Sequence, residues 1–366
     1  MKVLTVCKLG FRGNPSRFSG DARARYHLTP IVLNKHVEQL HSIRFKRFSR
    51  PVPGIVEHTH LNWQGNLLLF PIAMFHILIK ALWICRREGI GYILGFTIPY
   101  GVLGWIVAKV MGRKVGISLI GADLYKGIRG AWYGRIVLSM LRRCDHVTVT
   151  GQEMKDILVA RGIPPDRIHV LPHGIRVPLS SLTNSRKEYA MVFVGELVQR
   201  KRVDVLLDAF QVVKGIYKEA RFCIVGDGPL REKLEEKSEK MQISDSIHFA
   251  GLQEDVWLYL EQSKIFVLAS EGEGLPFALI EAMACGLVPV VTDVGTIRDT
   301  VKHGTNGFLV NVGDSGSLAQ NVVTLLSDVD LYDKMSADAA TVREHFSYEK
   351  TIDAWDKIFS YSTDDC

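Results

Sequence analysis

The stretch IFVLASEGEGLPFALIEAMACG, residues 265–286, places a short apolar run, a glycine-rich turn and a helical segment in direct succession. The run Ile265–Ala269 has the length and β-branched character of a buried strand. Pro276 suits the first turn of a helix, where its missing N–H costs nothing. Gly272 and Gly274 let the backbone of the turn approach a ligand closely. A strand, a turn and a helix in this order form the βα unit of a parallel sheet.

The same alternation of short apolar and longer amphipathic runs extends over most of the chain. In the first half it predicts strands at Lys2–Cys7, Ile90–Leu94, Val115–Leu119, His146–Thr150 and Ile168–Leu171. In the second half it predicts strands at Ala190–Val194, Arg221–Val225, Ile247–Phe249, Ile265–Ala269, Val288–Thr292 and Gly307–Val310. We therefore expect an α/β protein with two doubly wound parallel sheets, which bind ligands at the carboxyl ends of their strands.

The chain length also favours two domains. A single hydrophobic core stops growing near roughly 250–300 residues, and this chain has 366. The polar stretch PLSSLTNSRKE (178–188) is predicted to be the linker. It separates a Rossmann-like domain at 1–178 from a second one at 179–345, followed by an amphipathic segment at 346–366. No G-x-G-x-x-G motif follows the first strand, which argues against a dinucleotide-dependent dehydrogenase.

Charge is distributed unevenly between the two halves. Residues 1–178 hold 26 Lys and Arg against 9 Asp and Glu, whereas residues 179–366 hold 19 against 30. The halves therefore carry +17 and −11. Such an asymmetry indicates that the first half faces an anionic partner, either a membrane surface or a phosphorylated substrate. The alternative is a charge pattern that serves only solubility.

Two further features bear on the cellular setting. The six cysteines are scattered without metal-ligand spacing, which is typical of reduced thiols in a cytosolic protein. The nineteen residues Leu67–Cys85 are mostly apolar, but Pro71, His76 and Lys80 interrupt them. We interpret this segment as a buried or membrane-lying helix in preference to a membrane span.

Two glutamates stand close to the helix start in the opening stretch. Glu273 lies just before the helix and Glu281 inside it, and exposed N–H groups at such a start favour an anion such as a diphosphate. The two carboxylates are suited to accept hydrogen bonds from sugar and ribose hydroxyls. The D-x-D spacing at Asp328–Asp330 lies far from this segment and is expected to cap a helix or to lie in a loop. We predict no metal site.

These residues carry a family resemblance. EGLPFALIEAMACG (273–286), with Glu273 and Glu281 as the ends of an E-x7-E motif, resembles the donor-site signature of retaining glycosyltransferases of family four. Three further segments are similar to family motifs in the same order: VFVGELVQRKRVDVLLDAF (192–210), CIVGDGPLREKL (223–234) and DVGTIRDTVKHGTNGFLV (293–310).

The resemblance implies a GT-B fold, in which two Rossmann-like domains face each other across a cleft. It implies transfer of a sugar, of the hexosyltransferase type, from a nucleotide diphosphate sugar, with no metal and no other cofactor. The family's last helix crosses back onto the first domain, so residues 346–366 are expected to pack there.

The resemblance also assigns roles to individual donor-site residues. Lys201 would neutralise the donor diphosphate as the leaving group departs. Glu273 would bind the transferred sugar and Glu281 the ribose, with the backbone N–H groups of Gly274 and Leu275 nearby. The loop 251–256 resembles the one that frames the nucleotide base.

One departure from the family concerns the phosphate contacts. Family members commonly have arginine directly after the glycine of the first motif, Gly195, where this chain has Glu196. A carboxylate does not bind phosphate, so a neighbouring cation must replace the arginine. Arg200 and Arg202 flank Lys201 and are the candidates.

A second departure concerns the acceptor. SLIGADLY (118–125) aligns with a family turn that usually reads His-Gly-x-Asp; Gly121 and Asp123 fit, but Ile120 replaces the histidine. Transfer with retention is thought to proceed by front-face attack, in which the leaving phosphate helps to deprotonate the acceptor. Asp123 is therefore predicted to orient the acceptor.

Basic and aromatic residues in the first half suggest a membrane partner. His41–Arg50 alternates cations with Phe45 and Phe48. Other basic residues follow the Asp123 turn: Arg129, Arg135, Arg142 and Arg143. Such residues can lie against anionic lipid headgroups. They would equally suit nucleic acid, but the second-half motifs do not support that partner, and none is expected.

The sequence as a whole predicts a retaining glycosyltransferase that works at the cytoplasmic face of a membrane as a peripheral protein. Its acceptor would be a glycan or a lipid-linked sugar in cell-surface polysaccharide or glycolipid biosynthesis. Two alternatives stay open. One is a catalytically degenerate partner subunit, suggested by Glu196 and Ile120, and the other is a sugar-nucleotide epimerase of the same fold.

Overall fold

The computed structural model consists of two compact units. Of the residues that the structure describes, the first unit contains those up to Gly174 and those from Ser347 onward, and the second contains those within Ile175–Phe346. The residues that the structure describes are 1–6, 28, 31, 34–44, 55–59, 69–119, 133–171, 174–175, 187–253 and 255–363. The predicted linker lies largely outside them.

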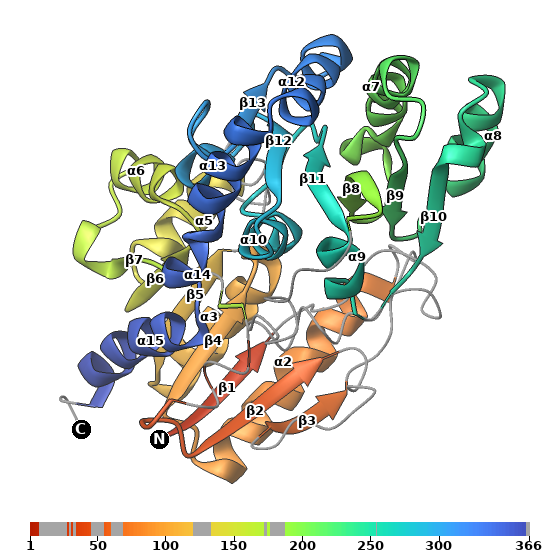
Figure 1. Cartoon of the computed structure of the whole chain (residues 1–366). Coiled ribbons are helices and arrows are strands. Elements are labelled where there is room, and N and C mark those ends of the chain that lie inside the picture. The colour runs from red at the N-terminus through yellow and green to blue at the C-terminus, as the bar shows by residue number, and fades with distance from the viewer. Residues whose placement is uncertain are drawn as a thin grey trace. The chain divides into compact units, whose positions relative to one another are not determined.

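The first unit is built on a parallel sheet, whose described strands follow the order β3-β2-β1-β4-β5-β6-β7 (Figure 1). The strands are β1 Lys2–Val6, β2 Gln39–Arg44, β3 Ile55–Thr59, β4 Tyr92–Phe96, β5 Lys114–Leu119, β6 His146–Val149 and β7 Ile168–Val170. From β1 the chain moves outward to β2 and β3, then returns to form β4 on the other side of β1. The order of the strands therefore reverses between β1 and β4.

Of the helices that the structure describes, four cover one face of this sheet: α2 Leu69–Glu88, α3 Ile98–Met111, α5 Tyr133–Leu141 and α6 Gln152–Ala160. Each precedes the next strand of the sheet, as a crossover helix must in a parallel sheet. Their buried side chains, such as Ile77, Val107 and Leu158, share one apolar cluster with Leu4 and Ile93 of the strands.

The opposite face is covered by the last helix, α15 Tyr348–Thr363. Trp355, Ile358 and Phe359 are buried in a cluster with Val3 and other side chains of that face. The Phe359 ring stands edge-on to the Tyr92 ring of β4, with 5.4 Å between centroids and an interplanar angle of 90°. The end of the chain thus completes the core of the unit in which the chain begins.

Two strands of the first unit were not predicted from the sequence. β2 and β3 carry polar residues, and in β2 both His41 and Ser42 are buried. Buried polar side chains interrupt the apolar run by which a strand of a parallel sheet is recognised. The expectation that His41–Arg50 faces a membrane is therefore wrong for its first residues, because His41–Ile43 lie inside the sheet. Residues 45–50 lie outside the described part.

The apolar segment Leu67–Cys85 forms most of α2, whose first residue is Leu69. The helix is buried along one side and exposed along the other. Within the described part of the chain, no helix is long and apolar enough to cross a membrane.

The second unit is also built on a parallel sheet, and its described strands follow the order β10-β9-β8-β11-β12-β13. The strands are β8 Tyr189–Val194, β9 Phe222–Val225, β10 Ile247–Gly251, β11 Ser263–Leu268, β12 Val288–Thr292 and β13 Phe308–Val310. All of them correspond to predicted strands. The order reverses between β8 and β11, which places the ends of these two strands side by side.

The connecting segments of the second unit are mostly helical. The α-helices are α7 Val203–Ile216, α8 Arg231–Lys240, α9 Trp257–Glu261, α10 Phe277–Ala284, α11 Ile297–Thr300, α12 Ser315–Ser327, α13 Val329–Ala340 and α14 Val342–His345. Short 3₁₀ turns occur at η1 Pro165–Arg167 in the first unit and at η3 Gln199–Lys201 and η4 Ser244–Ser246 in the second. The expectation that the D-x-D residues cap a helix is confirmed, because the Asp328 carboxylate accepts a hydrogen bond from Leu331 N at 2.9 Å and starts α13.

Candidate active site

The strand-order reversal in the second unit brings two loops together. The β8 loop, residues 195–202, follows β8 and contains η3; the β11 loop, residues 269–276, follows β11 and leads into α10. Glu271 N in the second loop donates a hydrogen bond to Arg200 O in the first, at 2.9 Å. Ligands of doubly wound folds bind at such a reversal, beyond the carboxyl ends of the strands.

A buried ion pair joins the two loops. Lys201 Nζ lies 2.5 Å from Glu273 Oε1, and the side chains of the two residues are only 11% and 8% exposed. Arg200 approaches the same oxygen at 3.2 Å through Nη1, and it also donates to Gly272 O. Two cations from the β8 loop therefore share one carboxylate of the β11 loop.

The electrostatics of this cluster keep Glu273 ionised. Burial opposes ionisation and by itself raises the pKa of Glu273, but the charges of Lys201 and Arg200 and the hydrogen bond from Lys201 outweigh it. The net effect lowers the pKa of Glu273 below its ordinary value. The cluster has more positive than negative charge, so it can accept an additional anion without losing its internal pairing.

The structure distinguishes the two arginines that the sequence made equal candidates for the phosphate contact. Arg202 has a left-handed backbone conformation and starts α7. Its guanidinium bridges Asp204 and Glu271, each at 3.2 Å. Arg200, in contrast, lies beside Lys201 on Glu273. Arg200 is the arginine that the fold brings to the buried cation cluster.

The remaining predicted donor-site residues lie on or near the same loops. Pro276 is the residue that precedes the first turn of α10, one position earlier than expected. Gly274 and Leu275, directly before it, are buried. Glu281 lies within the helix and is 5% exposed. Gly195, the first residue after β8, is also buried.

Two glycines that sequence reasoning did not assign hold the loops in place. Gly226 follows β9 with φ +138°, and a Cβ there would lie 1.9 Å from Gly195 O. Gly295 follows β12 with φ +58°, and a Cβ there would lie 1.9 Å from Glu273 O. The sequence did contain a signal for both positions, because a glycine stands shortly after β9 and shortly after β12.

The acceptor-side predictions fall outside the described part of the chain. Ile120, Gly121 and Asp123 belong to residues 120–132, which lie outside the described residues. The acceptor-orienting role of Asp123 therefore stays a prediction.

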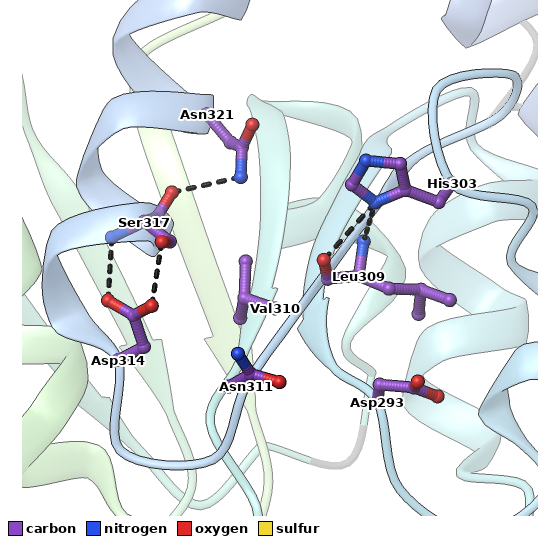
Figure 2. Close-up of a pocket in the computed structure, with 8 residues that line it drawn as sticks. All are labelled: Asp293, His303, Leu309, Val310, Asn311, Asp314, Ser317 and Asn321. Atoms are coloured by element: carbon purple, nitrogen blue, oxygen red, sulfur yellow. Dashed lines mark hydrogen bonds between the residues drawn. The ribbon is translucent and has the colours of Figure 1, made fainter.

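A pocket of about 360 Å³ lies elsewhere in the second unit, near the ends of β12 and β13 and the start of α12 (Figure 2). Its lining consists of Asp293, His303, Leu309, Val310, Asn311, Asp314, Ser317 and Asn321. Figure 2 shows that several of its polar groups bond to one another: Asp314 accepts from Ser317 N and Oγ, and His303 Nδ1 contacts the Leu309 backbone. Lys201, Glu273 and Glu281 do not line it.

The described residues offer no ready metal site. Among them, no group of three or more His, Cys, Asp or Glu side chains is arranged to hold a metal ion. The two loops themselves offer fixed charges, backbone N–H groups and carboxylate acceptors.

Comparison with known proteins adds a second line of observation. Residues 180–342 match the family model described as glycosyl transferases group 1, and residues 44–177 match the one described as glycosyltransferase family 4. The chain is 24% identical over 336 residues to N-acetyl-alpha-D-glucosaminyl L-malate synthase of Bacillus anthracis, with 86% of each protein covered. It is 26% identical over 292 residues to the putative colanic acid biosynthesis glycosyltransferase WcaL of Salmonella typhimurium, with 75% of this chain and 71% of that protein covered.

A solved structure has the same fold over the whole chain. Anabaena HepE in complex with UDP superimposes with a TM-score of 0.78 at 17% identity, and the match covers 99% of this chain and 100% of that one. The same protein has also been solved with UDP-glucose.

Proposed function

Because this chain belongs to the family 4 glycosyltransferases and has their GT-B fold, we propose that it moves a sugar, with retention of anomeric configuration, from a nucleotide diphosphate to a glycan or lipid-linked acceptor. The observation that carries the proposal is the cluster of Lys201, Arg200 and Glu273 where the strand order reverses. It presents two cations around a single buried carboxylate at the edge where this fold binds ligands.

In this proposal the donor diphosphate lies against Lys201 and Arg200. Glu273 fixes the ammonium group of Lys201 before the donor binds, so little reorganisation is needed when charge develops on the leaving phosphate. The backbone N–H groups of Gly274 and Leu275 are further donors, and Glu281 would accept hydrogen bonds from the ribose. Glu273 would also contact the transferred sugar through its second carboxylate oxygen.

The proposed reaction is a front-face displacement. The bond between the anomeric carbon and the phosphate oxygen breaks, and the acceptor oxygen forms a new bond to that carbon on the same face. The acceptor proton passes to the departing phosphate. The protein supplies charge stabilisation and positioning, which are sufficient for a step in which the substrate provides its own base.

The comparisons support the choice of substrates. HepE has been solved with UDP and with UDP-glucose, so UDP is the first nucleotide to test. WcaL is named for colanic acid biosynthesis, which supports a polysaccharide pathway for this chain as well. The charge of +17 on residues 1–178 supports an acceptor at an anionic membrane surface. We propose that the protein works there from the cytoplasmic side.

Thermal stability of the purified protein with saturating UDP, GDP, ADP or CMP tests the donor site. A ligand at a hundred times its dissociation constant stabilises a protein by roughly 2.7 kcal/mol. We expect one nucleotide to raise the midpoint by a few degrees. If no nucleotide shifts a demonstrably folded sample, the proposed donor site is wrong and the degenerate partner subunit becomes the better hypothesis.

Measuring donor turnover distinguishes a transferase from the remaining alternative, a sugar-nucleotide epimerase. A transferase consumes the nucleotide sugar rapidly only when its acceptor is present, and the sugar becomes part of the acceptor. An epimerase of the same fold consumes the donor without any acceptor. Product analysis by mass spectrometry in the presence and absence of a membrane-lipid extract distinguishes the two outcomes.

A further inference from the structure

The helix α2 of the first unit exposes a row of large apolar side chains. Ile72 is 55% exposed, Phe75 65%, Ile79 51% and Trp83 50%. At 3.6 residues per turn they lie within an arc of roughly 80° and extend about 16 Å along the helix. We call these four residues the α2 stripe. Single exposed apolar residues are normal on a protein surface, but a continuous row with two aromatic rings marks an interaction site.

The stripe does not belong to the core of the unit. The side of α2 that packs into the core is the opposite one, where Ala73, Ile77, Ala81 and Ile84 are completely buried. Ile77, Ala81 and Ile84 share the apolar cluster of the sheet and its covering helices. The helix is thus held in place by one side and free to present the other to a partner.

Positive charge accompanies the stripe. Residues 69–114, which span α2, β4 and α3, contain six Lys and Arg residues and one acidic residue, Glu88. Glu88 is only 28% exposed and contacts Arg87 Nε at 3.4 Å. The Arg87 guanidinium also lies over the Trp83 ring, 4.9 Å from its centroid. A cation therefore stands directly beside the aromatic end of the stripe.

The exposed cations gather at one edge of the sheet. α2 and α3 each lead into a strand of the same parallel sheet and contact each other, so both helices end at the amino edge of the strands. Four exposed basic residues stand at or just beyond these two helix ends: Arg86, Arg87, Lys109 and Arg113. The apolar row and the basic group thus occupy neighbouring parts of one surface.

We propose that α2 lies flat on an anionic lipid bilayer, with the α2 stripe inserted between the headgroups and the basic residues at the helix ends in contact with acidic lipids. An interfacial helix has this combination of an apolar face and adjacent Lys or Arg. The inference deepens the proposed function and rests on it, since a lipid-linked acceptor would then lie in the membrane on which the first unit is seated.

The charge pattern favours lipid over a second copy of the chain. Four side chains on one helix provide far less contact than the roughly 800 Å² per partner of a stable interface. A second copy would also bring an equally positive surface to the contact, which opposes association. Neither the small contact area nor the charge repulsion opposes binding to an anionic bilayer, because it contacts the whole stripe and attracts the cations.

Co-sedimentation with vesicles tests the proposal. The samples are wild type, the stripe variant Phe75→Ser/Trp83→Ser and the control variant Val212→Ser/Ile216→Ser. The control residues are 51% and 58% exposed on α7, so both variants remove two apolar side chains from a helix surface. With vesicles of phosphatidylcholine and phosphatidylglycerol we expect the stripe variant to bind roughly tenfold more weakly or worse, and the control to bind like wild type.

The charge component is tested with Arg86→Gln/Arg87→Gln. We expect this variant to bind the mixed vesicles several-fold more weakly than wild type and its residual binding to depend less on salt, because fewer exposed charges are left for salt to screen. Pure phosphatidylcholine vesicles should bind wild type poorly.

Three results would overturn the proposal. They are absence of wild-type binding to the anionic vesicles, unchanged binding of the stripe variant, and a wild-type dimer in gel filtration that the stripe variant abolishes. The last result would assign the stripe to a second copy. The nucleotide-induced thermal shift is measured on every variant; if it is preserved while vesicle binding is lost, the donor site is intact and only the membrane contact has been removed.

Discussion

The two units place their charged residues in opposite ways. At the loops of the second unit, Lys201 and Glu273 are almost fully buried and paired at 2.5 Å. In the first unit, the described cations near α2 are largely exposed and gather at one end of an apolar row. Buried charges with fixed partners are suited to a small anionic ligand and its chemistry. Exposed charges beside apolar side chains are suited to a broad surface such as a membrane. We therefore propose that the second unit provides the donor chemistry and that the first unit provides the membrane contact.

The largest expected effect comes from removing the buried cation. Lys201→Met should reduce turnover at least a hundredfold, because one preorganised charge at a leaving group contributes about 3 kcal/mol or more to the barrier. Steady-state kinetics with the identified donor and acceptor measure this. The matched control is Arg202→Gln, a cation of the same loop that bridges Asp204 and Glu271. Similar losses in both variants would remove the distinction between the cation paired with Glu273 and the one that bridges Asp204 and Glu271.

The next largest effect concerns the contribution of the Lys201–Glu273 ion pair to protein stability. Glu273→Gln should lower the free energy of unfolding by about 3 kcal/mol, because it leaves Lys201 as an uncompensated buried charge. Urea denaturation measures the loss. In the double variant Glu273→Gln/Lys201→Met much of the stability should return while activity stays absent. Additive losses in the double variant would contradict a coupled pair.

A smaller effect is expected at Gly295, which supports the β11 loop. Gly295→Ala should destabilise the protein by about 2 kcal/mol and weaken nucleotide binding, since the new Cβ would collide with Glu273 O. Gly304→Ala is the control: Gly304 also has positive φ, at +77°, but no atom lies within 4 Å of the position that a Cβ would take there. It should cost about 1 kcal/mol for backbone strain alone. Equal effects at the two positions would mean that the close contact is unimportant.

The smallest expected effect is a dependence of protein stability on pH in the acid range. Since the pKa of Glu273 is lowered in the folded protein, its ionised form contributes stability that is present above the ordinary glutamate pKa, near 4.3. That contribution is lost as the pH falls through the folded value. The stability difference between wild type and Glu273→Gln should therefore narrow as the pH falls below the ordinary glutamate pKa. A difference that is constant with pH would contradict the role of the two cations.

Much of the architecture could be predicted from the sequence, and the reasons are local. The apolar runs of β1, β4, β8, β11 and β12 are easy to recognise because these strands lie inside a parallel sheet and are buried on both faces. The segment around Glu273 and Glu281 could be recognised as a site because a glycine turn and a proline mark the start of α10.

What could not be predicted depends on contacts between distant residues. Lys201 and Glu273 are 72 positions apart, and only the adjacency of β8 and β11 brings them together. β2 was missed because His41 and Ser42 are buried polar residues. From the sequence, the α2 stripe could be detected only as part of a long apolar segment. Which of its side chains are exposed depends on which side of the helix packs on the sheet.

The most direct test of the account compares UDP with uridine in equilibrium binding to wild type and Lys201→Met, with Arg202→Gln as the control. If the buried cation cluster holds the donor diphosphate, wild type and the control should bind UDP far more tightly than uridine, and Lys201→Met should lose most of that preference while its affinity for uridine is unchanged. A Lys201→Met protein that is folded and prefers UDP as strongly as wild type would contradict the account, because the diphosphate would then be bound by other residues.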